Sequence, residues 1–173
     1  MSKALLLIDL QNDYFPGGAF ALWNTDAVLD ACEAAIANAH EVGAAIIHIQ
    51  HIADPEAGIV PFFNEGTVGA RIHKRIREAA PDAPVVVKHY ADSFHQTMLA
   101  DELSKVGATE LLVAGMMTQN CVTHTAISKA AESYDVTVLV DCCTTVNEML
   151  HMIALHALST RVALVSSGEA LAG

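Results

Sequence analysis

The chain has 173 residues, of which 53% are hydrophobic and 17% charged, and its net charge is −11 with histidine neutral. Such an acidic chain lacks the basic surface that binds nucleic acid, which excludes that class of partner. No run of about 18 apolar residues is present, so we expect no membrane span and no membrane partner. The length predicts a single domain over residues 1–173.

Six short apolar runs predict buried strands. In chain order they lie at residues 3–10, 44–51, 84–89, 110–116, 135–141 and 161–167. All are rich in Val, Ile and Leu without polar alternation, as in strands covered on both faces of a parallel sheet. Helical patterns lie between them at residues 25–43, 93–107, 120–134 and 144–160. The alternation predicts an α/β fold, a three-layer doubly wound sandwich around a mainly parallel six-stranded sheet.

Two long segments, residues 11–24 and 52–69, follow the first and second predicted strands. Both leave the carboxyl ends of strands, where open α/β sheets bind ligands. Their Phe and Trp residues are Phe15, Phe20, Trp23, Phe62 and Phe63. We expect these side chains to line a pocket. The alternative is that they cover the edge of the sheet or contact a second copy of the chain.

Three polar residues stand where predicted strands end. Asp9 ends the first strand, Lys88 ends the third, and Cys121 follows the fourth at the start of a helix. A carboxylate and an ammonium are costly there unless they pair, and a helix start favours a thiolate. Cys121 could therefore act as a nucleophile, with Asp9 as general base and Lys88 lowering the pKa of the thiol. A structural Asp–Lys pair beside an inert cysteine explains the same pattern equally well.

The other cysteines and the histidines supply rival interpretations. Cys142 and Cys143 follow the fifth strand but do not stand at a helix start after a turn glycine, so neither is the favoured nucleophile. Without a CxxC pair, a zinc-ribbon or thioredoxin-type site is unsupported. We expect reduced thiols in a cytoplasmic protein. His95 and His124 are the histidines to compare with the proposed site.

Three segments, in the right order, resemble the isochorismatase-like cysteine hydrolase superfamily, which includes nicotinamidases and N-carbamoylsarcosine amidases. They are ALLLIDLQNDYFPGGA at residues 4–19, VVVKHYADSFHQTML at 85–99 and LLVAGMMTQNCVTHTAISKAAE at 111–132. The resemblance implies a catalytic triad of Asp9, Lys88 and Cys121. It also implies a cis peptide between Met116 and Met117, and an oxyanion hole made of the Met117 and Cys121 N–H groups.

The resemblance further implies a cysteine hydrolase that cleaves a C–N bond of a small amide, carbamoyl or lactam substrate through a thioester. We expect the residues that contact this small molecule to be Phe15, Trp23, Gln50, His51, Phe94 and Asn120. The alternatives are a member acting on another substrate class, an enol ether or nicotinamide, and a non-catalytic member that binds a small molecule. A redox role for the thiols is a further possibility.

Two features concern cofactors and partners. Nicotinamidases bind a metal through an Asp-x-His pair after the second strand, whereas this chain has Gln50 and His51 there and its Asp54 lies further on. We therefore predict no catalytic metal and no cofactor. The high apolar fraction and the apolar helical stretch at residues 147–158 predict a homo-oligomer, either a dimer or a tetramer. Burial of this stretch within the monomer is the alternative.

Overall fold

The computed structural model describes residues 2–54, 56 and 58–172. Its centre is a six-stranded sheet in the order β3-β2-β1-β4-β5-β6, and every neighbouring pair of strands is parallel. The strands are β1 (Lys3–Ile8), β2 (Ala45–His51), β3 (Val85–Lys88), β4 (Glu110–Met116), β5 (Asp135–Thr144) and β6 (Ala163–Val165). The predicted α/β fold is confirmed, with a sheet that is parallel throughout.

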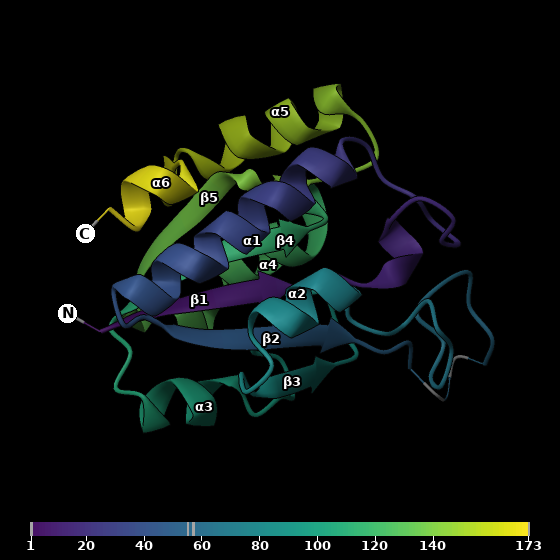
Figure 1. The fold of residues 1–173 in the computed structure, drawn as a ribbon, viewed down its shortest axis with the longest axis horizontal. Coiled ribbons are helices and arrows are strands. Elements are labelled where there is room, and N and C mark those ends of the chain that lie inside the picture. Colours follow the sequence, from purple (N-terminus) through teal and green to yellow (C-terminus); the bar gives the residue numbers. More distant parts are fainter. Residues whose placement is uncertain (1, 55, 57, 173) are drawn as a thin grey trace.

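Helices cover both faces of the sheet and complete the three layers (Figure 1). On one face pack α1 (Thr25–Glu41), α2 (Lys74–Ala79) and α6 (Ser167–Ala170). On the other pack α3 (Leu99–Lys105), α4 (Thr123–Ala126) and the end of α5 (Glu148–Leu158). Within the described part of the chain, no helix has both the length and the apolar character needed to cross a membrane.

The alternation of side chains along β1 shows why its sequence is continuously apolar. Leu5 and Leu7 belong to the core beneath α1, whereas Ala4, Leu6 and Ile8 belong to the core on the opposite face. All five are at most 1% exposed. A strand between two helical layers has no solvent face, so it needs no polar alternation.

The predicted helix at residues 93–107 is wrong in its first half, because α3 begins only at Leu99. Ser93, a residue type that often caps helices, is bound to α4 instead. The Ser93 N–H donates to Thr125 Oγ1 at 3.0 Å, and the Thr125 hydroxyl donates to Ser93 Oγ at 2.7 Å. This contact between distant segments holds residues 93–98 as turns.

The predicted helix at residues 120–134 is divided into three short pieces. A π-helical turn (Thr118–Val122) leads into α4, and a 3₁₀ helix (Lys129–Ser133) follows. Ser128 has an extended backbone with ψ 145°, which ends α4, and its side chain caps the next helix by accepting from Ala130 N. Helices α2 and α6 were not predicted, and at six and four residues they are too short for a clear periodic pattern.

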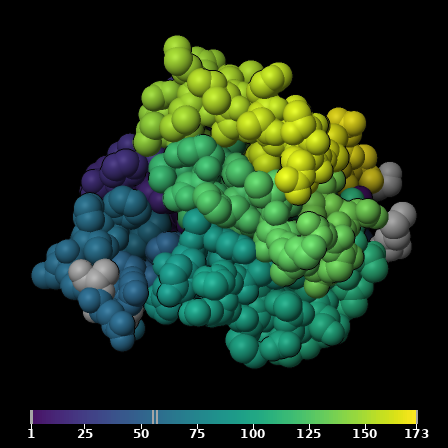
Figure 2. All heavy atoms as spheres, turned by 180° about the vertical axis from the view of Figure 1, so that it is seen from behind, coloured from purple at the N-terminus to yellow at the C-terminus, as the bar shows by residue number. Residues whose placement is uncertain are grey.

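The two long loops lie together beyond the carboxyl ends of β1 and β2 (Figure 1). The same loops occupy one end of the opposite face in Figure 2. Their aromatic rings hold them together. The Tyr14 and Phe62 ring centroids are 5.5 Å apart, and those of Phe20 and Phe62 are 5.0 Å apart. The loops therefore form one wall over the edge of the sheet where the polar strand ends meet.

Candidate active site

The parallel register brings the polar strand ends to one level. Ile8 pairs with Ile49 on one side and with Gly115 on the other, and His51 pairs with Lys88. Asp9 follows Ile8 with φ +52°, a left-handed conformation that aspartate adopts more readily than most residues. That turn places the carboxylate at the edge of the sheet, as the sequence predicted.

Gly115 allows β4 to pass close to β1. It has φ +125°, and a Cβ atom there would lie 2.0 Å from Ile8 O, so no other residue fits without displacing the strand. The peptide bond between the two following residues, Met116–Met117, is cis, as the sequence resemblance implied. The following turn is closed by hydrogen bonds to the Met117 carbonyl oxygen, which accepts from the N–H groups of Asn120 at 3.0 Å and Val122 at 3.3 Å.

Lys88 lies at the centre of the site. Its Nζ is 3.0 Å from Asp9 Oδ2, 3.2 Å from Cys121 Sγ, 3.1 Å from Tyr90 O and 2.8 Å from His51 Nδ1. Asp9 and Lys88 are completely buried and Cys121 is 2% exposed. The second carboxylate oxygen, Asp9 Oδ1, is buried without a hydrogen-bond partner among the described residues. The site therefore holds a buried ion pair, a thiol and one carboxylate oxygen without a protein partner among the described residues.

Burial and the neighbouring charges together set the protonation of these groups. Burial and the Asp9 carboxylate raise the pKa of the Cys121 thiol well above its ordinary value, and the Lys88 ammonium opposes that rise. Burial works to lower the pKa of Lys88, but Asp9 and Cys121 outweigh it and raise that pKa. Burial and Lys88 lower the pKa of His51 to about 4, with Asp9 opposing. At neutral pH the site thus contains an ammonium, a neutral imidazole and a thiol.

A cavity of 210 Å³ opens beside His51. Its walls are His51, Ala53, Asp54, Val60, Pro61, Phe62 and Phe63. The Phe63 ring is 5.7 Å from the His51 ring and 4.6 Å from the Tyr14 ring, centroid to centroid. The cavity is small and mostly apolar. Of the five aromatic residues expected to line a pocket, Phe62 and Phe63 line this cavity, whereas Phe15, Phe20 and Trp23 do not.

Asp13, which the sequence reasoning missed, joins the two loops. Its Oδ2 accepts from Phe63 N at 2.8 Å and its Oδ1 accepts from Ala19 N at 3.2 Å. A Cβ atom on Gly69 would lie 2.0 Å from Asp13 Oδ1, so glycine is needed for this close approach. Its place in the motif QNDYF, four residues after Asp9, was the available signal.

The residues expected to contact a substrate lie in different surroundings. His51 is in the site. Gln50 donates its Nε2 to Ala70 O at 2.8 Å and so supports the second loop. The Phe15 ring packs 4.4 Å from the His73 ring, and the Phe94 ring is 6.2 Å from that of Tyr134.

The remaining two residues expected to contact a substrate are Trp23 and Asn120. Trp23 is 36% exposed, and its ring is 6.1 Å from the His151 ring. Asn120 stands one residue before Cys121 in the π-helical turn, and its carbonyl oxygen lies 2.9 Å from His124 Nδ1. Substrate contact by these six residues stays a prediction, and His51 has the most direct link to the triad.

The rival residues contact other groups. His95 packs its ring 4.6 Å from the Tyr90 ring. Cys143 lies in β5 with its thiol 3.9 Å from Val113 O, and Cys142 is completely buried. Among the cysteines of the described chain, Cys121 is the one that contacts Lys88.

The surroundings of the site do not fit a catalytic metal. One group of three potential ligand side chains occurs in the described part of the chain, namely Asp9, His51 and Cys121, with their ligand atoms within 4.8 Å of one another. Lys88 Nζ contacts all three, so an ammonium stands where a cation would bind. Asp54, the acidic residue that follows the position of the nicotinamidase Asp-x-His pair, instead accepts a hydrogen bond from Glu56 N at 2.9 Å within the second loop. We therefore derive no step through a metal.

Comparison with known proteins gives concordant matches. The family model of the isochorismatase domain matches residues 3–170. The isochorismatase family protein YddQ of Bacillus subtilis is 35% identical over 98% of this chain and 98% of its own length. A streptothricin hydrolase of Streptomyces noursei is 34% identical over 72% of this chain, which spans 47% of that protein. A crystal structure from Oleispira antarctica, assigned as an isochorismatase hydrolase, has TM-score 0.87 and 32% identity, covering 99% of this chain and 97% of that one.

Proposed function

Because this chain belongs to the isochorismatase family of hydrolases, we propose that it cleaves the C–N bond of a small amide, carbamoyl or lactam compound through a thioester on Cys121. The family resemblance read from the sequence is confirmed. The observation that carries the proposal is the contact of one buried ammonium, Lys88 Nζ, with both Asp9 Oδ2 and Cys121 Sγ.

In the proposed reaction, Cys121 Sγ attacks the carbonyl carbon while its proton passes to Asp9. The unpartnered Oδ1 of Asp9 supplies the acceptor. Lys88 stabilises the sulfur as negative charge develops on it. The N–H groups of Met117 and Cys121 are proposed to bind the oxyanion, as the family resemblance implies.

The intermediate then collapses in the proposed sequence. The C–N bond breaks, and the leaving nitrogen takes the proton from Asp9, which leaves a thioester on Cys121. Water attacks that thioester and gives a proton to Asp9. The C–S bond breaks, and the sulfur recovers the proton as the carboxylic acid product departs. Each step uses Asp9 as the single proton carrier, which fits one buried carboxylate beside one thiol.

A panel of small amides, ureas and lactams tests the proposal through release of ammonia or amine. We expect turnover that disappears in Cys121→Ser. The matched control is Cys143→Ser, a second buried cysteine whose thiol lies 3.9 Å from Val113 O in the sheet. Activity that survives Cys121→Ser, or that is lost equally in both variants, would contradict the proposal. Binding without any turnover across the panel would favour the non-catalytic alternative.

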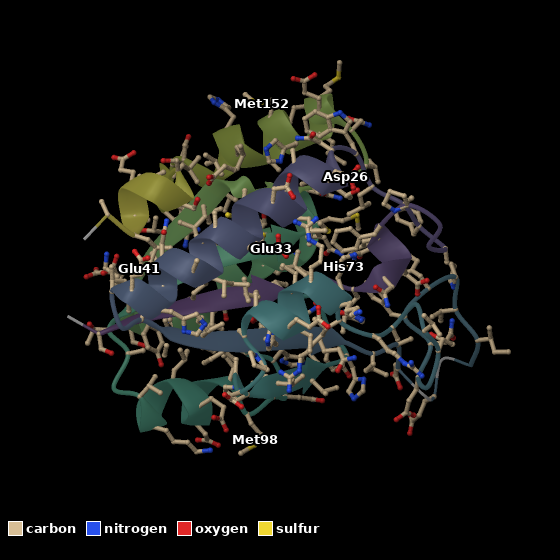
Figure 3. The ribbon with its side chains drawn as sticks, viewed as in Figure 1. Asp26, Glu33, Glu41, His73, Met98 and Met152 are labelled. Carbon is tan, nitrogen blue, oxygen red and sulfur yellow. The ribbon has the colours of Figure 1, made fainter. Side chains whose placement is uncertain are left out.

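We also propose that the chain forms a homo-oligomer through α5. Met149 is 74% exposed, Met152 is 58% exposed and Ile153 is 59% exposed, and Met152 points away from the sheet (Figure 3). Adjacent exposed apolar side chains of this size are typical of interaction surfaces. Light scattering should give a dimer or tetramer, which Ile153→Asp dissociates.

The cytoplasmic location stays part of the proposal, and the four free thiols are compatible with it.

A further inference from the structure

The contacts of Lys88 contain an imbalance between donors and acceptors. An ammonium carries three N–H donors. Lys88 Nζ has four neighbours within 3.2 Å, namely Asp9 Oδ2, His51 Nδ1, Tyr90 O and Cys121 Sγ. At most three of them can receive a proton of Lys88 at full strength, so the four groups compete.

His51 is a strong competitor because of its geometry. Its Nδ1 is the nearest of the four atoms, at 2.8 Å. A ring nitrogen so close to an ammonium accepts through its lone pair, which leaves the hydrogen of the neutral imidazole on Nε2. Gln11 holds the backbone of His51 in place, since His51 N donates to Gln11 Oε1 at 2.7 Å and His51 O accepts from Gln11 Nε2 at 2.8 Å.

Cys121 is the weakest of the four acceptors. A neutral sulfur accepts hydrogen bonds poorly compared with a carboxylate, a carbonyl or an imidazole nitrogen, and its contact is the longest, at 3.2 Å. In the resting state the three N–H groups of Lys88 therefore satisfy Asp9, His51 and Tyr90. The Cys121 thiol keeps its own hydrogen.

We propose that His51 is a positioning residue that holds one proton of Lys88 away from Cys121 and thereby keeps the thiol protonated in the resting protein. The thiolate then forms only when Asp9 takes the thiol proton, because Asp9 as a neutral acid releases an N–H of Lys88 to the sulfur. The role of this thiolate in catalysis rests on the proposed function. The competition of the four acceptors for the N–H groups of Lys88 does not rest on it, because that competition follows from the contacts of Lys88 alone.

Other ionisable groups around the thiol do not replace His51 in this role. The Asp9 carboxylate, at the end of β1, disfavours the thiolate. Tyr14, in the first loop, stays a neutral phenol because burial and the nearby Asp9 and Cys121 raise its pKa. His89 is the further titratable group that acts on His51, and its charge disfavours protonation of the ring. Lys88 is the cation among these groups, so the distribution of its N–H groups controls the stabilisation of a thiolate.

The test compares two nearly isosteric variants, His51→Leu and His51→Asn. Leucine removes the acceptor, and asparagine keeps an oxygen near the position of Nδ1. The rate of alkylation of Cys121 by iodoacetamide, followed by peptide mass mapping at neutral and mildly alkaline pH, reports the thiolate fraction without requiring activity. We expect His51→Leu to react about tenfold faster than wild type, the size of one hydrogen bond to a charged group. His51→Asn should stay near the wild-type rate.

A third comparison shows whether the effect acts through the ammonium. In a Lys88→Met background, His51→Leu should no longer change the alkylation rate. Equal rates for His51→Leu and wild type, equal increases in His51→Leu and His51→Asn, or an increase that persists in the Lys88→Met background would each overturn the inference. Failure of the proposed function would appear separately, as a Cys121→Ser variant that keeps its activity while these alkylation rates follow the expected pattern.

Discussion

Lys88 Nζ lies 3.0 Å from Asp9 Oδ2, and neither side chain is exposed to solvent. The two charges come from the ends of different strands, β3 and β1, so their contact depends on the folded sheet. Each charge compensates the other, because a single buried charge without its partner is strongly destabilising.

We predict that Lys88→Met lowers the free energy of unfolding by about 3–5 kcal/mol, because it leaves the Asp9 carboxylate buried without a cation. Adding Asp9→Asn to that variant should recover most of the loss, since the remaining amide is neutral and asparagine also tolerates the left-handed backbone at this position. Urea unfolding of both variants measures the difference. A double variant less stable than Lys88→Met would contradict the assignment of a compensated pair.

Gly115→Ala should destabilise the fold by about 3 kcal/mol or more, because its Cβ would meet Ile8 O and its backbone φ is positive. The matched control is Gly168→Ala in α6, where a Cβ meets nothing within 4 Å. That substitution should change stability by less than about 1 kcal/mol. Thermal unfolding of the pair checks both, and similar melting temperatures would refute the close approach of β4 to β1.

Asp141 in β5 serves as a control for Asp13 in the first loop. Each accepts two hydrogen bonds, Asp13 from Phe63 and Ala19, and Asp141 from the N–H and hydroxyl of Ser167 at the start of α6. Because Asp13 is buried and Asp141 is exposed, Asp13→Ala should cost about 1–3 kcal/mol of stability and Asp141→Ala about 1 kcal/mol. Turnover at saturating substrate should fall only in Asp13→Ala, because that variant loses the hydrogen bond to Phe63, which lines the cavity. Equal turnover in the two variants would exclude a role for Asp13 in shaping the site.

His51 predicts an acid-sensitive component of stability. Its pKa is lowered to about 4 from an ordinary value of 6.5, so the unfolded chain binds more protons between those values. The stability from a neutral His51 is present above pH 6.5 and is lost as the pH falls toward 4. Between about pH 7 and about pH 5, wild type should lose on the order of 2 kcal/mol more than His51→Leu. Urea titrations at the two pH values measure this, and parallel losses would contradict it.

Much of this site could be predicted because it depends on strand ends. The apolar runs before Asp9 and Lys88 mark strands covered on both faces, and the carboxyl ends of parallel strands meet at one edge. The contact of these residues with Cys121 follows from that topology. The family motifs added the cis peptide at Met116–Met117, which periodicity cannot reveal.

Other features depend on contacts that the sequence does not encode locally. Ser93 has the character of a helix cap, but its pairing with Thr125 on a distant segment moves the start of α3 to Leu99. Tyr90 contributes a carbonyl oxygen to Lys88, and a backbone acceptor leaves no trace in residue type. The backbone of His51 is bonded by Gln11 from the first loop, which no spacing rule connects with it.

The most direct measurement of the central claim is peptide mass mapping of the protein quenched during turnover of a slowly deacylated substrate. The account predicts an acyl group bound as a thioester to Cys121, absent from Cys121→Ser and unchanged in Cys143→Ser. An acyl group on Cys142 or Cys143, or full turnover in a protein that lacks the Cys121 thiol, would contradict it.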